Sequence, residues 1–332
     1  MPTWGEILKE LSITGEKLKT PPFDAIRRLY LAKLHEHTKN NIILYATNWT
    51  MPKGPVSSDM LSINIGDVQG FMEVINGLKG DKLDIILHSP GGSPEATEAI
   101  VNYLRTKFSY IRVIIPHAAM SAATMLACSA DEIVMGKHSY IGPIDPQMLV
   151  PSRNGLQAIP AHAIVEQFQI AKKECKEDPS NLGVWLPIIE QYGPALLVQC
   201  KNAIELSKIL VKTWLKAFMF KNEPDIQKKA GRIALQLAKH ANFLSHGRFI
   251  PRDQARTKFS LRITDLESDQ QLQDLVLSVY HATTHTFNGT SAVKIIENHT
   301  GKAFIRKSDQ ILVPIPMNVP VPPQPEEDTK KS

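Results

Sequence analysis

Residues 84–146, DIILHSPGGSPEATEAIVNYLRTKFSYIRVIIPHAAMSAATMLACSADEIVMGKHSYIGPIDP, contain two turns that each join a predicted strand to a predicted helix. In the first turn, Ser89–Gly92, two glycines leave backbone N–H groups open to close approach. In the second, Ser121 starts a helix, where free N–H groups and the helix dipole favour negative charge. An oxyanion hole and a nucleophile are two parts of an acyl-transfer site. The stretch therefore predicts such a site, whose base must come from elsewhere in the chain.

Strand and helix patterns alternate from Leu61 to Pro146. Near-continuous apolar strands between helices predict an α/β fold, in which helices cover both faces of a largely parallel sheet. A right-handed crossover would bring both turns to the same edge of that sheet. The predicted strands are Asp84–His88, Ile111–Pro116 and Glu132–Met135, and the predicted helices are Asp67–Leu78, Pro94–Lys107 and Ser121–Ser129.

Composition divides the whole chain into five predicted segments: an N-terminal helical segment (1–50), the α/β core (51–150), a helical region (151–242), a C-terminal α/β portion of the same catalytic domain (243–312) and a Pro-rich tail predicted to be disordered (313–332). In the N-terminal segment a helix over Ala25–Lys39 precedes a strand over Asn41–Ala46. The helical region is expected to begin with a loop over Pro151–Pro160. Further helices are predicted over Ala161–Glu177, Ile188–Phe220 (interrupted near Gly193), Asp225–Ala241 and Gln271–His285.

Bulk composition narrows the class of protein. With 43% hydrophobic and 21% charged residues, the 332-residue chain is typical of a globular protein. Its net charge of +5 comes without a dense Lys/Arg block, so we expect no nucleic-acid partner. Cys128, Cys175 and Cys200 lie far apart, which argues against a zinc site or a disulfide scaffold. We expect no metal and no organic cofactor.

The N-terminus is charged and amphipathic and lacks the apolar core of a signal peptide. No stretch approaches the roughly 18 uninterrupted apolar residues of a membrane span. The sequence therefore predicts a cytoplasmic protein.

Within the two turns, Ser121 is the candidate nucleophile, and the N–H groups of Gly91, Gly92 and Ala122 are the candidate oxyanion donors. Simpler roles remain open for each residue. Ser121 has a type of side chain that often caps helices, and the glycines could form an ordinary left-handed turn. Two such turns only 30 positions apart are more specific evidence for an acyl-transfer site than either turn alone.

Three motifs carry a family resemblance: H-S-P-G-G at 88–92, P-H-x-A-M-S-A-x-T-M at 116–125 and G-P-I-D-P-Q at 142–147. As a set they resemble the serine dehydrogenase proteinase family, a branch of the Clp-protease/crotonase superfamily that is related to signal peptide peptidases. The resemblance extends over most of the chain, including Lys294–His299. It implies a core of stacked ββα units, with helical additions at the N-terminus and after residue 160. It also suggests a homo-oligomer and, as a lesser implication, peripheral membrane association.

The resemblance further implies a Ser-Asp-His triad in that chain order. Ser121 matches the nucleophile, Asp145 the acid and His246 the base. Asp145 could instead form a turn before Pro146. His240 is an alternative base, although it could also cap a helix end. A Ser–Lys dyad with Lys137 or Lys172 is another alternative, and Ala123 stands where the family usually has glycine.

Together these observations predict a serine-type endopeptidase that acts on a polypeptide. Two other functions remain open. A crotonase-like acyl-CoA enzyme would use carboxylates such as Glu95 or Glu98 for acid–base work. A catalytically degenerate scaffold or peptide-binding protein would use the apolar helices of 188–220 as its surface.

Overall fold

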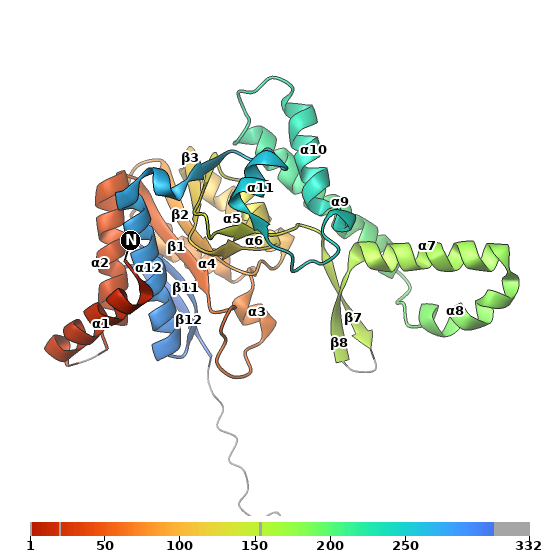
Figure 1. Cartoon of the computed structure of the whole chain (residues 1–332), viewed down its shortest axis with the longest axis horizontal. Coiled ribbons are helices and arrows are strands. Elements are labelled where there is room, and N and C mark those ends of the chain that lie inside the picture. Colours follow the sequence, from red (N-terminus) through yellow and green to blue (C-terminus); the bar gives the residue numbers. More distant parts are fainter. Residues whose placement is uncertain (1, 20, 153–154, 309–332) are drawn as a thin grey trace, which may run out of the picture.

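A seven-stranded sheet forms the centre of the computed structural model, which describes residues 2–19, 21–152 and 155–308 (Figure 1). The strand order is β10-β5-β3-β2-β1-β11-β12, with parallel pairing from β10 to β1 and antiparallel pairing of β11 with β1 and β12. The prediction of an α/β fold with a largely parallel sheet is confirmed. The predicted tail at 313–332 lies outside the described residues. The strands of this sheet are β1 (Asn41–Thr47), β2 (Lys82–His88), β3 (Tyr110–Ile115), β5 (Glu132–Met135), β10 (Ile263–Asp265), β11 (Ala292–Asn298) and β12 (Ala303–Lys307).

Helices cover both faces of the sheet, which is why its strands are apolar without alternation. All seven residues of β1 are buried. Ile43 and Tyr45 belong to the layer containing α4, α5 and α6, whereas Ile42 and Leu44 belong to the layer containing α2 and α12. These helices are α2 (Phe23–Thr38), α4 (Asp67–Ile75), α5 (Pro94–Lys107), α6 (Ala122–Cys128) and α12 (Gln270–Gly289), and α1 (Trp4–Leu18) packs against α12.

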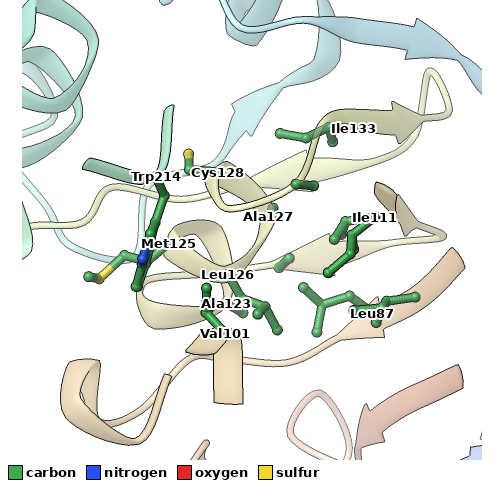
Figure 2. Close-up of a cluster of buried hydrophobic side chains, with 14 of the residues drawn as sticks. Leu87, Val101, Ile111, Ala123, Met125, Leu126, Ala127, Cys128, Ile133 and Trp214 are labelled. Carbon is green, nitrogen blue, oxygen red and sulfur yellow. The ribbon is translucent and has the colours of Figure 1, made fainter. Parts of the chain in front are cut away.

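Helix α6, which starts after Ser121, is the most deeply buried helix in the first layer. Every residue from Ala122 to Cys128 is buried. Its side chains meet Leu87 of β2, Val101 of α5 and Trp214 of α9 (Leu196–Ala217) in one hydrophobic cluster (Figure 2). Close packing of this kind holds the start of α6 in a fixed position.

A small second sheet lies beside the two turns. It consists of β4 (Ala118–Ala119), β6 (Tyr140–Ile141) and β9 (Ile250–Pro251). The remaining elements of the body are α3 (Ser58–Leu61), α10 (Ile226–Ala238), η2 (His240–Asn242), α11 (Arg252–Thr257) and η3 (Leu266–Ser268).

An arm extends from the body of the molecule (Figure 1). It contains β7 (Gln147–Ser152), β8 (Gly155–Pro160), α7 (Ala161–Glu177), η1 (Pro179–Asn181), α8 (Leu182–Ile189) and the start of α9 (Leu196–Ala217). One prediction is wrong here. The residues of the expected loop that the structure describes, 151–152 and 155–160, belong to the β7–β8 hairpin, which has only two strands and so tolerates proline at its edges. The predicted interruption of the Ile188–Phe220 helix near Gly193 is confirmed, since α8 ends at Ile189 and α9 begins at Leu196.

Two ion networks are buried beside the sheet. Lys294 Nζ donates to Asp67 Oδ1 at 2.8 Å, to Asp67 Oδ2 at 2.9 Å and to the Ser62 carbonyl at 2.7 Å, and Lys294 and Asp67 are both fully buried. Tyr45 Oη also donates to Asp67. In the second network Arg27 pairs with Glu297. Burial lowers the pKa of Lys294, and the Asp67 carboxylate opposes that shift.

Other features bear on the sequence predictions. All three cysteines are free, and Cys128 is buried as core packing. No helix in the described ranges has the length and apolar character needed to cross a bilayer. The predicted domain boundaries stay predictions.

Candidate active site

Ser121 has a strained backbone at the junction of β4 and α6. Its φ of 50° and ψ of −121° place a non-glycine residue at positive φ, which costs about 1–3 kcal/mol and persists only where the surroundings enforce it. Its side chain makes no capping hydrogen bond to α6. The simple helix-cap role therefore does not describe Ser121. A serine on a sharp turn between a strand and a helix is the geometry of a nucleophile elbow.

The first turn packs directly against the second. Ser89 N donates to the Ala118 carbonyl at 3.1 Å, and Met120 N donates to the Ser89 carbonyl at 2.9 Å. Gly91 has a φ of +101°, and a Cβ atom at that position would lie 2.7 Å from Ser121 Cβ and 2.8 Å from Ala122 N. Only glycine permits this approach. The structure thus brings the two predicted turns together.

We expect Gly91→Ala to lower the free energy of unfolding by about 2 kcal/mol more than Gly77→Ala, as measured by urea denaturation. Gly77 is a matched control because its φ is +86° but a Cβ there would meet no heavy atom within 4 Å. The difference between the variants isolates the close approach to Ser121. Equal destabilisation would show that backbone conformation alone requires glycine at 91.

The three candidate oxyanion donors differ in what they already bind. Gly91 N–H donates to Ser89 Oγ at 3.2 Å. Gly92 is held by Ile63, since Ile63 N donates to the Gly91 carbonyl at 2.7 Å and Ser93 N donates to the Ile63 carbonyl at 2.9 Å. Within the described ranges, the N–H groups of Gly92 and Ala122 have no acceptor. These two are therefore the donors available to a substrate oxygen.

Ala123 stands where the family usually has glycine. Its N–H donates to the Met120 carbonyl at 2.8 Å, so the turn at the start of α6 forms with alanine at this position.

Asp145 lies fully buried between two histidines. Its Oδ1 is 2.8 Å from His246 Nδ1, and its Oδ2 is 2.8 Å from His240 Nδ1. Burial by itself raises the pKa of Asp145, but hydrogen bonds and charge from His246 and then His240 lower it below its usual value. The carboxylate is thus ionised at neutral pH and can orient both rings. The sequence indicates His240 only as an alternative to His246, whereas the structure places both histidines on one carboxylate.

Only one of the two histidines shares a cavity with Ser121. Ser121 and His246 line a cavity of about 310 Å³ together with Gly91, Gly92 and part of β7. His240 is not among the lining residues. In the described part of the chain no hydrogen bond joins Ser121 Oγ to His246. Such bonds often form only once substrate is bound, so the lack of this hydrogen bond does not exclude His246 as the base.

The other candidate residues lie away from this cavity. Lys137 is exposed in the turn after β5, and Lys172 is exposed on α7. Glu95 lies in the first turn of α5, where it accepts a hydrogen bond from Oγ of the N-cap Ser93 at 2.7 Å, and Glu98 lies about one turn further along the same helix. None of the four lines the cavity. The lysine dyad and the acyl-CoA alternative therefore lack the catalytic groups that each would need there.

His88 and His117, which flank the turns, do not line the cavity with Ser121. They line a separate cavity together with Tyr280 of α12, and their ring centroids are 5.4 Å apart. Among the described residues there is no group of three or more His, Cys, Asp or Glu arranged to hold a metal ion.

A mostly parallel sheet that presents a serine on a strained strand-to-helix turn is an arrangement that also occurs in serine hydrolases. Comparison with known proteins is more specific. Residues 60–182 match the family of ClpP-like SDH-type serine proteinases, and this match confirms the resemblance to serine dehydrogenase proteinases for that segment. The matched segment contains both turns and Asp145, and the match indicates a ClpP-like serine proteinase.

Individual relatives match this chain either over a short stretch of sequence or with low sequence identity. Over 87 residues the chain is 39% identical to uncharacterized protein MJ0137 and 40% identical to uncharacterized protein MJ1495, both of Methanocaldococcus jannaschii. Each overlap covers 26% of this chain and 30% of the relative, so the chain spans under a third of the curated relatives it matches. Among solved structures, a mutant of the 1510-N membrane-bound stomatin-specific protease is 14% identical, with a TM-score of 0.35, over 61% of this chain and 74% of that chain.

Proposed function

We propose that this protein is a serine peptidase in which Ser121, His246 and Asp145 form a catalytic triad. The strained backbone of Ser121, beside a cavity that His246 also lines, is the observation that carries the proposal. Strain of this kind concentrates at functional sites because the surrounding fold must enforce it. The buried carboxylate at 2.8 Å from His246 Nδ1 supplies the third group.

The mechanism follows the roles of these groups. His246 Nε2 accepts the proton of Ser121 Oγ as that oxygen attacks a peptide carbonyl, and it later protonates the leaving amine. Asp145 holds the ring with Nε2 facing the serine and stabilises the imidazolium. The oxyanion of the tetrahedral intermediate is stabilised by the Ala122 and Gly92 N–H groups, with Gly91 providing the space for approach. Each such donor is worth about 3–4 kcal/mol of transition-state stabilisation.

The β7–β8 hairpin supports a polypeptide as the substrate. Gln147 and Leu149 of β7 line the cavity. Among the described residues β7 pairs with β8 alone, so an extended chain could add to its other edge through backbone hydrogen bonds. Leu149 is 68% exposed and offers apolar contact to a substrate side chain.

We expect a fluorophosphonate probe to label the wild-type chain and to leave Ser121→Ala unlabelled, as followed by intact-mass spectrometry. The probe forms a covalent bond only with an activated serine, so the experiment needs no knowledge of the substrate. Ser207→Ala is the matched control, because Ser207 lines the same cavity but its Oγ already donates to the Ala203 carbonyl at 3.2 Å. Labelling of Ser121→Ala at the wild-type rate would refute the nucleophile assignment.

The predicted homo-oligomer remains a further proposal. It is supported by apolar side chains exposed on the arm, including Leu156 at 70% and Val184 at 69%. Such exposure on one projecting element is typical of an association surface. Sedimentation velocity of the wild type and of a Leu156→Glu/Val184→Glu variant tests it, and a monomeric wild type would refute it. Cytoplasmic localisation also stays a prediction.

A further inference from the structure

The loop that carries Asp145 is tied on both sides by backbone hydrogen bonds. Before Asp145, Ile144 N donates to the Leu237 carbonyl at 3.0 Å. After it, the Pro146 carbonyl accepts a hydrogen bond from Ala161 N at 2.9 Å. Leu237 lies in the last turn of α10, and Ala161 is the first residue of α7. The backbone position of the proposed catalytic acid therefore depends on both helices.

The C-terminal end of α10 supplies the carbonyl groups for this arrangement. The last four carbonyls of a helix have no partner within the helix itself, so they are open to other donors. One of them binds the Asp145 loop, and the next, the Ala238 carbonyl, accepts a hydrogen bond from His162 Nε2 at 3.1 Å. Two residues after Ala238, His240 Nδ1 lies 2.8 Å from Asp145 Oδ2. The end of this helix thus holds Asp145 through the backbone and through His240.

His162 joins the arm to the end of α10. It is the second residue of α7, the helix that runs outward along the arm (Figure 1). A carbonyl can only accept a hydrogen bond, so Nε2 of His162 carries a proton. Burial lowers the pKa of His162, whereas the hydrogen bond to Ala238 and the charge of Asp145 oppose that shift. The ring is therefore neutral at pH 7.5, and its single proton is held by the Ala238 carbonyl.

His162 lies outside the catalytic cavity. Its side chain is half-buried, and the residues that line the cavity do not include it. Gln147 and Leu149, on β7 of the same arm, do line the cavity. The arm therefore meets the proposed catalytic centre twice, beside the cavity through β7 and behind the acid through His162. A residue outside the cavity cannot touch a substrate bound there, so any effect of His162 on the reaction acts through Asp145 and its neighbours.

We propose that His162 is a positioning residue for the catalytic acid. By holding the Ala238 carbonyl, it fixes the turn between α10 and His240 and so keeps His240 on the Asp145 carboxylate. Catalytic side chains keep a productive geometry only when supporting hydrogen bonds of this kind lock them in place. The inference rests on the proposed function, since the position of Asp145 affects the reaction only if Asp145 orients His246.

The test measures the rate at which a fluorophosphonate labels Ser121 at pH 7.5 in variants of the full chain. His162→Phe keeps a flat ring but has no donor, and we expect it to slow labelling about three- to fivefold, because one supporting hydrogen bond is lost. His162→Gln keeps an N–H donor of similar reach and should stay within about twofold of the wild-type rate. Adding His162→Phe to His240→Ala should slow labelling no further, because His162 acts through the side chain that His240→Ala removes.

A second readout does not require the serine to react. The NMR signal of the His240 Cε1–H group, identified by its loss in His240→Ala, should move in His162→Phe and return in His162→Gln. An unlabelled wild type would therefore refute the proposed function and still leave the positioning to be judged by this signal. Circular dichroism checks that each variant is folded, and His162→Ala replaces His162→Phe if the latter is not.

Four results would overturn the inference. The first is a His162→Phe variant that labels at the wild-type rate, and the second is a His162→Gln variant that labels as slowly as His162→Phe. The third is equal slowing by His162→Phe in the presence and absence of His240, which would show that the two residues act independently. The fourth is a His240 signal that does not move in His162→Phe.

Discussion

His246→Ala is expected to slow fluorophosphonate labelling of Ser121 by about 10³-fold or more, whereas His240→Ala slows it by only about tenfold. Removal of the base from a triad costs nearly as much as loss of the nucleophile, since the two act as a unit. His246 lines the cavity with Ser121, and His240 does not. His240 acts through Asp145, which it holds at 2.8 Å, so its loss loosens the carboxylate but leaves the base in place.

Second-order labelling rates at pH 7.5 measure both effects, and the two histidines serve as each other's control. Both donate to the same buried carboxylate and have similar exposure, 18% for His240 and 23% for His246. If the substitutions slowed labelling only by disturbing Asp145, His240→Ala and His246→Ala would therefore slow it equally. Equal losses would remove the case for His246 as the base, and a larger loss in His240→Ala would transfer that role to His240.

Lys294→Met is expected to lower the free energy of unfolding by about 3–5 kcal/mol, because it leaves the Asp67 carboxylate buried without its cation. Lys294 is fully buried, and all three of its ammonium donors are used. One of these donors holds the Ser62 carbonyl, and the next residue, Ile63, pairs with the first catalytic turn. The same variant is therefore also expected to slow labelling of Ser121.

Urea denaturation gives the stability change. Adding Asp67→Asn to Lys294→Met removes the unpaired charge and should restore about 1 kcal/mol or more. Lys173→Met is the surface control, since Lys173 and Glu177 are 76% and 66% exposed, and the change there should stay within about 0.5 kcal/mol. A loss in Lys294→Met no greater than in Lys173→Met would show that the buried pair contributes little.

Prediction from sequence succeeded where the signal is local. The apolar runs that became β2, β3 and β5 are continuous because helices cover both faces of the sheet, and such runs between helical patterns indicate this arrangement. The arm was harder to predict. Proline and glycine near 151–160 are typical of loops, yet the chain there forms a hairpin, because pairing between β7 and β8 overrides the local preference.

The sequence by itself determined the α/β fold class, the two turns and Ser121 as the candidate nucleophile, since each depends on residues adjacent in the chain. Only the tertiary structure could decide how the distant groups meet. It placed Gly91 against Ser121 and put His240 and His246 on opposite oxygens of Asp145, 95 and 101 positions away. Of the two histidines, only His246 lines the cavity with Ser121. Such contacts depend on how loops return to the sheet edge, and the chain carries no short-range pattern for that path.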